Sequence, residues 1–479
     1  MPSLSFKIGN SSRELLGFSL ITIISLLLAV ISYSIIPALI PLLLIGLYIS
    51  IVDLRLFYYL LIGLLAISTE LLLPGGIGLD FPSEPIMIFL TATYFVLLLY
   101  KPKDIIIPLK NPITVLIILH VLWIGITSIT GEDQVVSIKF FLAKIWYVIP
   151  FYFAFFLFIK NKKQLNIMLT TLVSFVALGA LYVMVKHYTL GMEYTTIELA
   201  VQPIYRNHVN YACLLSITLP YLWFVGWINR KNTIYKIAII ALNIFILIAI
   251  YFSFTRAAMA SVVIGLGAFL VLKMKLTRFA FIASILGGLL FVNYMVQNNR
   301  FMDYAPNFEK TVSHGDFDNL LEATAKGEDI STMERVYRWI AGARMVYERP
   351  IVGYGPNNFY PYYKNKTVNS FETYVSGNPE KSGIHCYYLM IPVEQGIPGA
   401  IIFLTLCFFL LYEAEKAYHA STDPYHKFIV AAAFISLITI LAILIVNDLL
   451  EADKVGPFFF LSGAIIVFVR RKNKKLTAP

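Results

Sequence analysis

Three arginines and one histidine in this 479-residue chain are placed where they could act on a phosphorylated substrate. Arg206, Arg256 and Arg335 lie in or beside polar segments that separate long apolar runs. A guanidinium group keeps its charge at physiological pH and can bind two phosphate oxygens together, so these residues suit a diphosphate. His385 closes a polar tract. Its imidazole, which titrates near neutrality, could accept a proton from a hydroxyl group or hydrogen-bond a departing phosphate.

Other polar side chains are weaker candidates. His208 could act as a second base, and Glu394 and Asp448 could orient an arginine or a histidine. Lys139 and Lys144 open an apolar run, and at 1.5 Å per residue Lys144 is expected about 10 Å below the outer membrane surface. A cation at that depth suggests a function, and its partner would be either a substrate phosphate or a buried carboxylate such as Glu70.

The strongest candidates also have purely structural interpretations. Arg256 at a helix end could be an interfacial side chain that reaches out of the membrane. Arg335, in the first turn of an expected helix, opposes the helix dipole and needs an anionic partner, for which Glu334 is the simplest choice. His385 could be a helix cap.

The elements that must position these residues are transmembrane helices. The chain is 58% hydrophobic and 14% charged, whereas soluble domains carry about 25% charged residues. Apolar windows of about 17–25 residues predict an all-α polytopic membrane protein with about twelve to fourteen transmembrane helices. The expected spans are 15–32, 35–52, 56–73, 85–100, 112–129, 138–159, 165–186, 209–228, 234–253, 257–273, 279–296, 386–412, 427–447 and 455–469.

The distribution of lysine and arginine predicts the orientation. Alternate loops are basic, including 101–110, 230–236 and the tail 470–475, while the opposite loops are not. By the positive-inside rule both termini are cytoplasmic and the polar tract faces outward. These basic loops account for the net charge of +10, so we expect no nucleic-acid partner. Three scattered cysteines provide neither a disulfide framework nor metal-ligand spacing.

The predicted organisation is a membrane bundle at 1–297, a large periplasmic loop at 298–384 and C-terminal helices at 385–479. A loop of this length without a function is uncommon. Ser331–Glu334 resembles a capping box that starts an amphipathic helix, which is expected on the outer membrane face or over a cavity. Its apolar stripe consists of Val336, Trp339, Ile340, Ala343, Val346 and Tyr347. Pro350–Phe359 is a glycine-bearing turn, and no Gly-Lys-Ser/Thr follows that would make it a phosphate loop.

These motifs resemble the O-antigen ligase and polymerase superfamily of bacterial membrane glycosyltransferases. The resemblance covers residues 200–460 and is carried by Glu334–Trp339, Pro350–Phe359, His385–Leu389, Glu394–Gly399, Arg206–Asn210 and Ser253–Ala258. The chain departs from the family in two respects. It has more expected spans than many members, and the common His-Asn pair is His385-Cys386 here.

The resemblance implies a C-type glycosyltransferase-like architecture in the bacterial inner membrane. It implies transfer of a glycan from undecaprenyl diphosphate to a hydroxyl of lipid A-core or another surface carrier, without a metal or other cofactor. The expected catalytic residues are His385, Arg335 and Arg256. The expected substrate-binding residues are Arg206, His208, Asn210, Lys144, Lys139, Trp339 and Glu394.

Several functions share this set of residues. A ligase, a polymerase and a protein O-oligosaccharyltransferase would activate the donor in the same way and differ only in the acceptor. A flippase or transporter of lipid-linked oligosaccharide also has many spans. Such proteins tend to carry functional charges inside the spans and to have related halves, whereas the charges here concentrate in one outward tract and no clear repeat is evident.

Overall fold

The computed structural model describes residues 11–31, 53–73, 77–102, 108–304, 330–368, 376–378 and 382–477, together with residues 40, 41, 44, 48, 105 and 372. Within these ranges the protein is almost entirely helical and contains one two-stranded sheet. Ten of the described helices are long and apolar enough to cross a membrane. The all-α polytopic membrane fold expected from the sequence is therefore confirmed.

Most predicted spans coincide with observed helices. The long elements are α1 (Ser11–Ile31), α4 (Ser83–Tyr100), α5 (Pro112–Ile129), α6 (Gln134–Val148), α8 (Lys162–Thr189), α10 (His208–Ile228), α11 (Thr233–Tyr251), α12 (Arg256–Lys273), α13 (Thr277–Val296), α17 (Tyr387–Ala420), α18 (Pro424–Ile443) and α19 (Gly456–Thr477). A π-helical turn, η3 (Ile149–Phe153), continues α6 into α7 (Phe155–Phe158). The predicted span 35–52 lies outside the described residues, apart from four isolated positions.

Shorter elements connect these helices or lie across their ends. They are α3 (Leu54–Leu64), η4 (Tyr194–Thr196), α9 (Ile197–Val201), η5 (Gln297–Tyr304), α15 (Ile330–Glu348), α16 (Phe359–Tyr363), η6 (Lys364–Lys366) and η8 (Leu449–Glu451). The strands are β1 (Thr69–Leu73) and β2 (Ile77–Phe81).

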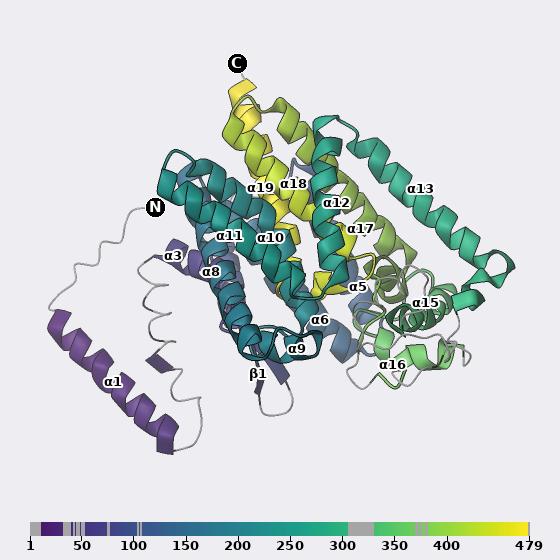
Figure 1. Ribbon diagram of the computed structural model, residues 1–479, viewed down its shortest axis with the longest axis horizontal. Helices are drawn as coiled ribbons and strands as arrows, with labels where there is room; N and C mark the ends of the chain where they lie inside the picture. Colours follow the sequence, from purple (N-terminus) through teal and green to yellow (C-terminus); the bar gives the residue numbers. More distant parts are fainter. Residues whose placement is uncertain are drawn as a thin grey trace.

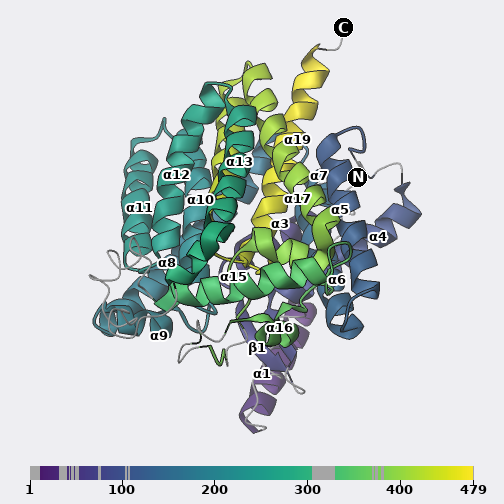
Figure 2. The ribbon, with the colours of Figure 1, turned by 90° about the vertical axis from the view of Figure 1, so that its right-hand side faces the viewer.

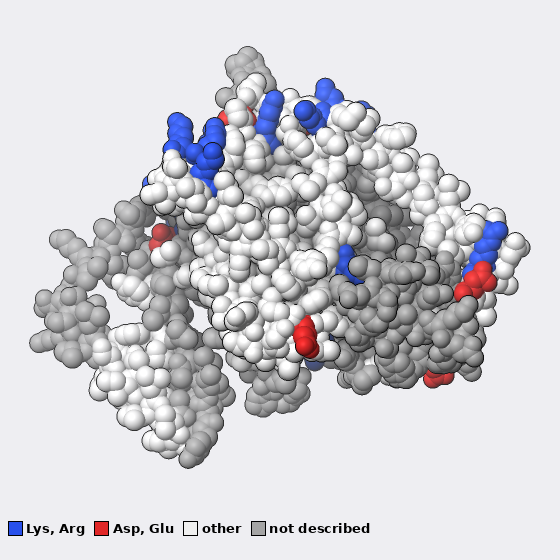
Figure 3. Space-filling model, in the orientation of Figure 1, with Lys and Arg blue, Asp and Glu red and all other residues white. Residues whose placement is uncertain are grey.

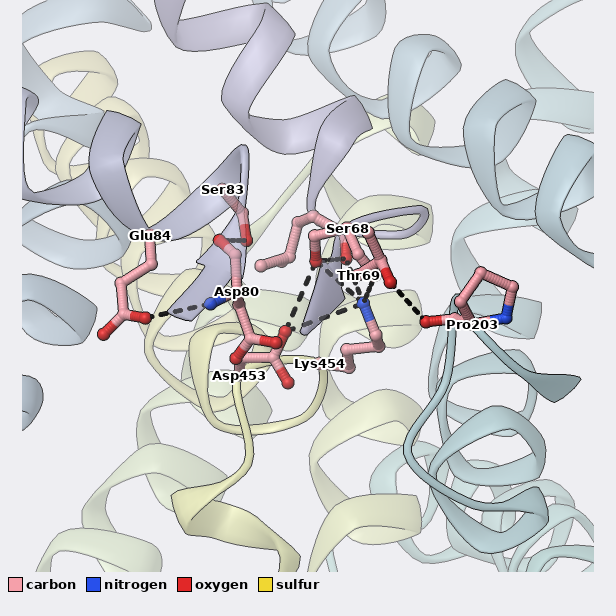
Figure 4. A network of polar contacts seen from close by, with 9 residues as sticks. Ser68, Thr69, Asp80, Ser83, Glu84, Pro203, Asp453 and Lys454 are labelled. Atoms are coloured by element: carbon pink, nitrogen blue, oxygen red, sulfur yellow. Dashed lines mark hydrogen bonds and ion pairs between the residues drawn. The ribbon is translucent and has the colours of Figure 1, made fainter. Parts of the chain in front are cut away.

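The predicted span 56–73 is wrong. Helix α3 ends at Leu64, and the rest of the apolar run enters an antiparallel hairpin in which Thr69 pairs with Phe81. The cause is a buried cation from the far end of the chain. The ammonium group of Lys454 donates hydrogen bonds to the carbonyl oxygens of Leu65 and Ser68, at 3.2 and 2.8 Å, and so satisfies the carbonyl groups where the helix stops. Figure 4 shows Lys454 between Ser68 and Asp453.

The helices form one bundle with α10 and α18 at its centre. These two are the most buried of the candidate spans, and α12 and α19 pack against α18. Figure 1 shows α13 leaning away from α17 towards the end of the molecule where α15 lies. In Figure 2, α15 runs crosswise over the ends of the spans. The segment that carries Arg335 therefore covers one end of the bundle.

Basic side chains gather at the other end. Figure 3 shows Lys and Arg side chains along the edge of the molecule that carries the C-terminus. In the same orientation, Figure 1 places the connections between α10 and α11 and between α12 and α13 at this edge. Those connections contain Arg230, Lys231, Lys273 and Lys275. Figure 3 thus shows these described basic side chains grouped at the end of the spans that carries the C-terminus.

A break in α17 anchors the turn after α15 (residues 350–356) to the bundle. Gly396 has φ 70° and ψ 175°, a backbone conformation that glycine adopts far more readily than any other residue. A Cβ atom there would lie 2.0 Å from the carbonyl oxygen of Ile351. Trp123 in α5 donates a 2.8 Å hydrogen bond to the carbonyl oxygen of Gln395, which lies at the break.

The turn after α15 is joined to this break by backbone hydrogen bonds. They run from Tyr354 N to Val393 O at 2.9 Å, from Gly355 N to Glu394 O at 2.9 Å, and from Ile397 N to Pro350 O at 2.8 Å. Two of the motifs that carry the family resemblance, 350–359 and 394–399, are therefore structural partners. Their contact fixes where α15 ends relative to α17.

The buried face of α15 differs from the predicted one. Met333, Tyr337, Ala341 and Met345 are buried against the bundle, whereas the predicted stripe, from Val336 to Tyr347, is half-buried or exposed. The sequence carries two apolar faces on this helix, and hydropathy alone cannot rank them. The helix begins at Ile330, so Ser331 lies within it and not at its N-cap, and the side chain of Ser331 lies outside the described residues.

Candidate active site

The loop before α17 places His385 at the end of the bundle that α15 covers. His385 has φ 56°, in the left-handed region that non-glycine residues seldom occupy. Its backbone amide donates a hydrogen bond to the carboxylate of Asp448, in the turn before η8. The imidazole Nδ1 is buried and has no hydrogen-bond partner among the described residues. The ring is therefore held by its backbone and keeps one nitrogen available.

Burial and two nearby positive charges favour the neutral form of the His385 ring. Burial, followed by the guanidinium groups of Arg338 and Arg335, lowers the pKa of His385 to about 3. Burial disfavours the charged imidazolium, and two nearby cations disfavour it further. At physiological pH the ring is uncharged, which is the form that can accept a proton.

Arg338 is the anchor of this arrangement. Its Nη1 donates to the carbonyl oxygen of Gly383 at 3.0 Å, and its Nη2 lies 3.6 Å from Glu334 Oε2. Ser376 donates to the other carboxylate oxygen of Glu334 at 2.5 Å. Glu334 therefore pairs with Arg338, and the capping role expected for Glu334 is wrong: its carboxylate turns into the protein, where a buried cation compensates its charge.

Gly383 has no room for a side chain. A Cβ atom on it would lie 1.8 Å from Asp448 Oδ2. Burial raises the pKa of Asp448, and the charge of Arg338 acts in the opposite direction. The Asp448 carboxylate thus links Gly383, Arg338 and His385. We call Arg335, Arg338, His385 and Asp448 the His385 group.

A second polar group lies at the start of α12. His208 Nδ1 pairs with the carboxylate of Glu198, and the ring of Tyr194 lies edge-on to His208 at a centroid distance of 6.2 Å. Burial raises the pKa of Tyr194, and Arg256 lowers it, so the guanidinium group is close to the phenol. Thr255 Oγ1 donates to the carbonyl oxygen of His208 at 3.5 Å. We call Tyr194, Glu198, His208 and Arg256 the His208 group.

Two other expected ligands flank the His208 group. Arg206 is exposed. Asn210 is buried, and its Oδ1 has no hydrogen-bond partner among the described residues. The backbone amide of Asn210 donates to Asn207 Oδ1 at 2.9 Å, so this pair caps α10.

The remaining expected substrate-binding residues belong to neither group as defined above. Lys139 is exposed on α6, and Trp339 is half-buried on α15. Glu394 is buried and accepts hydrogen bonds from the backbone amides of Asn357 and Phe359, so its carboxylate holds the turn against α17. Lys144 is paired with a carboxylate, as the sequence allowed, but the partner is Glu451 and not Glu70.

Sequence reasoning missed Arg338, Tyr387 and Glu451. Arg338 follows Glu334 by four residues, a spacing that favours an ion pair on a helix, so its role was accessible from the sequence. Glu451 is 307 residues from Lys144 and 64 from Tyr387, and no local pattern links positions so far apart.

The fold and the candidate site together define a class: a polytopic helical membrane protein whose guanidinium groups and neutral imidazole are suited to group transfer. A family model described as O-antigen ligase matches residues 240–404, from α11 into α17. This match supports the resemblance to the O-antigen ligase and polymerase superfamily over the part of the chain that it covers. A comparison with curated proteins gave no match. The matched range contains Arg256, Arg335 and His385, whereas Arg206, His208 and Lys144 precede it.

Proposed function

We propose that the protein is an O-antigen ligase-type enzyme that transfers a glycan from undecaprenyl diphosphate to an acceptor hydroxyl. The observation that carries this proposal is the neutral imidazole of His385, flanked by Arg335 and Arg338, within the range that matches the family. The acceptor is lipid A-core or another surface carrier, and the reaction takes place at the outer face of the bacterial inner membrane.

The proposed reaction uses this imidazole as the base. The acceptor oxygen forms a bond to the anomeric carbon of the glycan, and the bond from that carbon to the phosphate oxygen breaks. The diphosphate leaves with the bonding electrons, and His385 takes the proton of the hydroxyl group. Because two cations depress the pKa of His385, an anionic diphosphate beside them would raise that pKa towards neutrality. The base would thus gain strength when the donor binds.

Guanidinium groups neutralise the leaving group in this proposal. Arg335 lies close enough to the His385 ring to lower its pKa, and it belongs to the motif Glu334–Trp339 that carries the family resemblance, so we assign a diphosphate contact to Arg335. Arg256 is the second diphosphate contact, and the assignment is supported by its place at the N-terminal end of α12 beside the half-buried phenol of Tyr194. Bidentate contacts from guanidinium groups to a diphosphate need no metal ion, and we infer that none takes part.

The other expected residues complete the proposed binding surface. His208 and Asn210 contact the glycan near Arg256, and exposed Arg206 attracts the anionic donor. Lys139 and Trp339 meet lipid headgroups or the carrier lipid at the membrane surface, while Glu394 shapes the site through the turn that it holds. The basic ends of the spans in Figure 3 support cytoplasmic termini, which would put α15 outside.

A reconstituted transfer assay tests the proposal. Vesicles would contain the protein, an undecaprenyl diphosphate-linked glycan and lipid A-core, with and without EDTA. We expect His385→Gln and Arg335→Met to abolish transfer, whereas Arg344→Met keeps it. Arg344 is a matched control because it lies on the same helix, is exposed and donates only to the carbonyl oxygens of Lys366 and Thr367.

The products separate the competing functions. Glycan attached to lipid A-core supports the ligase. Longer chains that stay on the carrier lipid indicate a polymerase, and donor that crosses the bilayer without bond cleavage indicates a flippase. Transfer at the wild-type rate by folded His385→Gln and Arg335→Met proteins would overturn the assignment, and loss of transfer in EDTA would overturn the inference that no metal takes part.

A further inference from the structure

A buried ion pair lies next to the start of α17. Lys144 Nζ in α6 is 2.5 Å from Glu451 Oε2 in η8, and the two side chains are 1% and 18% exposed. The hydroxyl group of Tyr387 donates to the other carboxylate oxygen, Oε1, at 2.5 Å, and Tyr387 is completely buried. Both oxygens of one carboxylate are thus occupied by side chains from two different elements. Removing either partner from a buried pair leaves a charge that nothing compensates.

The same turn is joined to the start of α17 at two levels. At the site, the amide of His385 donates to the carboxylate of Asp448. Two residues further along α17, Tyr387 bonds to Glu451, and its backbone amide donates to the carbonyl oxygen of Leu444 at 3.0 Å. Both contacts join the start of α17 to the turn at 448–451. A shift of Tyr387 relative to Glu451 would therefore also displace His385 relative to Asp448.

The far end of the turn is also fixed. Lys454 is buried and donates to Ser68 Oγ at 2.8 Å, while Ser68 Oγ donates to Asp453 Oδ2 at 3.4 Å (Figure 4). These bonds hold the end of the turn on Ser68, so they oppose a movement of the whole turn when a partner of Glu451 is removed. Its contact with α17 depends on the position of the Glu451 carboxylate.

We propose that Lys144, Glu451 and Tyr387 are positioning residues that hold His385 in place for the transfer reaction. His385 adopts φ 56°, and such a conformation persists in a non-glycine residue only when its surroundings enforce it. The link from Tyr387 to Glu451, two residues away, supplies that constraint. The inference rests on the proposed function, because it assumes that His385 is the base.

This role differs from the substrate contact expected for Lys144. The side chain is 1% exposed and its ammonium group is paired with Glu451, so a diphosphate could reach it only by displacing that carboxylate. A substrate contact predicts that loss of Lys144 raises KM for the donor. A positioning role predicts that kcat falls while KM stays unchanged.

Removal of one hydroxyl group provides the first test. Tyr387→Phe keeps the buried ring but removes the bond to Glu451, and we expect kcat to fall about tenfold to a hundredfold, as small displacements of catalytic groups do. Tyr388→Phe is the matched control, because the Tyr388 hydroxyl donates to Leu441 O at 2.9 Å and not to the turn. Lys144→Met should reduce kcat further, and Lys144→Arg should restore part of it. Wild-type kcat in Tyr387→Phe, or a rise in KM alone, would overturn the proposal.

Cys386 provides a second readout that does not depend on activity. It lies between His385 and Tyr387 and is half-buried, whereas Cys213 and Cys407 are buried. Burial raises the pKa of the Cys386 thiol, so its modification by a small neutral thiol reagent is expected to be slow in the wild-type protein. Tyr387→Phe and Lys144→Met should accelerate labelling at Cys386, located by mass spectrometry, and Tyr388→Phe should not.

The two readouts separate the hypotheses. Unchanged labelling in Tyr387→Phe, or faster labelling with wild-type kcat, would show that the link does not position the base. If His385→Gln retained transfer activity, the proposed function would fail, while faster labelling of Cys386 would still show that the link holds this segment.

Discussion

The two histidine-bearing groups each combine a histidine with arginine and a carboxylate, but the charges next to the two imidazole rings differ. His385 is half-buried, Arg338 and Arg335 lie close enough to lower its pKa, and its buried ring nitrogen Nδ1 has no partner among the described residues. In the His208 group, Nδ1 is occupied by the carboxylate of Glu198, and the two side chains are 18% and 47% exposed. The first environment keeps an imidazole neutral and available, whereas the second fixes the ring through an acid. The comparison favours the proposal that His385 acts as the base and that His208 contributes to binding.

Replacement of each histidine is the strongest test of this difference. His385→Gln should lower the transfer rate by about 10²–10⁴-fold, the usual contribution of a general base, whereas His208→Gln should lower it by less than about tenfold. The rates would be measured in reconstituted vesicles at equal protein amounts. Equal losses in the two variants would remove the distinction between the groups.

Replacement of one arginine in each group should separate stability from binding. Arg338→Met leaves the Glu334 carboxylate buried without its cation, which costs about 3–5 kcal/mol. Arg256→Met removes a positive charge that opposes the dipole at a helix N-terminus, so we expect a smaller loss of stability than in Arg338→Met. Thermal unfolding of the purified proteins would measure both effects. A similar drop in melting temperature for the two variants would contradict the structural role of Arg338.

A single added methyl group tests how closely Asp448 is held. Gly383→Ala would force a Cβ atom to within 1.8 Å of Asp448 Oδ2, so we expect the carboxylate to leave the His385 amide and the transfer rate to fall about tenfold to a hundredfold. Gly377→Ala is the control, since nothing lies within 4 Å of a Cβ atom at that position of the same loop. Equal rates in the two variants would show that Asp448 does not position the base.

The smallest expected effect is on the pH dependence of stability. The pKa of His385 is lowered to about 3 in the folded protein, so the unfolded chain binds the proton more readily between that value and 6.5. His385 therefore contributes stability that is complete above pH 6.5 and declines, by at most about 1.4 kcal/mol per pH unit, as the pH falls. His385→Gln should unfold with a weaker dependence on pH between about 7 and 5. An unchanged or steeper dependence on pH in this variant would contradict the expected environment of His385.

The sequence predicted the membrane helices well where they lie between clear polar breaks. The span 112–129 matches α5 at both ends, and 257–273 differs from α12 by one residue. It failed at 56–73, where an apolar run splits into a short helix and a strand. The split depends on Lys454, a residue almost four hundred positions away, which satisfies the carbonyl groups of Leu65 and Ser68.

The sequence indicated which charged residues are candidates for the site, but it did not indicate which side chains they pair with. The arginines of the polar segments and His385 stood out because charged groups are rare in this chain. Their counter-charges could not be read in the same way. Glu334 resembles a helix cap but pairs with Arg338, and the sequence allows Lys144 either a substrate phosphate or a carboxylate such as Glu70, whereas its partner is Glu451. A partner on another helix is chosen by tertiary packing, which hydropathy and spacing do not encode.

The break in α17 at Gly396 has a consequence for protein engineering. Because the turn at 350–356 completes its hydrogen bonds inside this interrupted helix, the outer segment and residues 393–397 form one structural unit. A chimaera that exchanges the acceptor-facing segment with that of a homologue would have to transfer both pieces together. If the segment that contains residues 350–356 were grafted alone, its backbone groups would no longer match their hydrogen-bond partners at the break in α17.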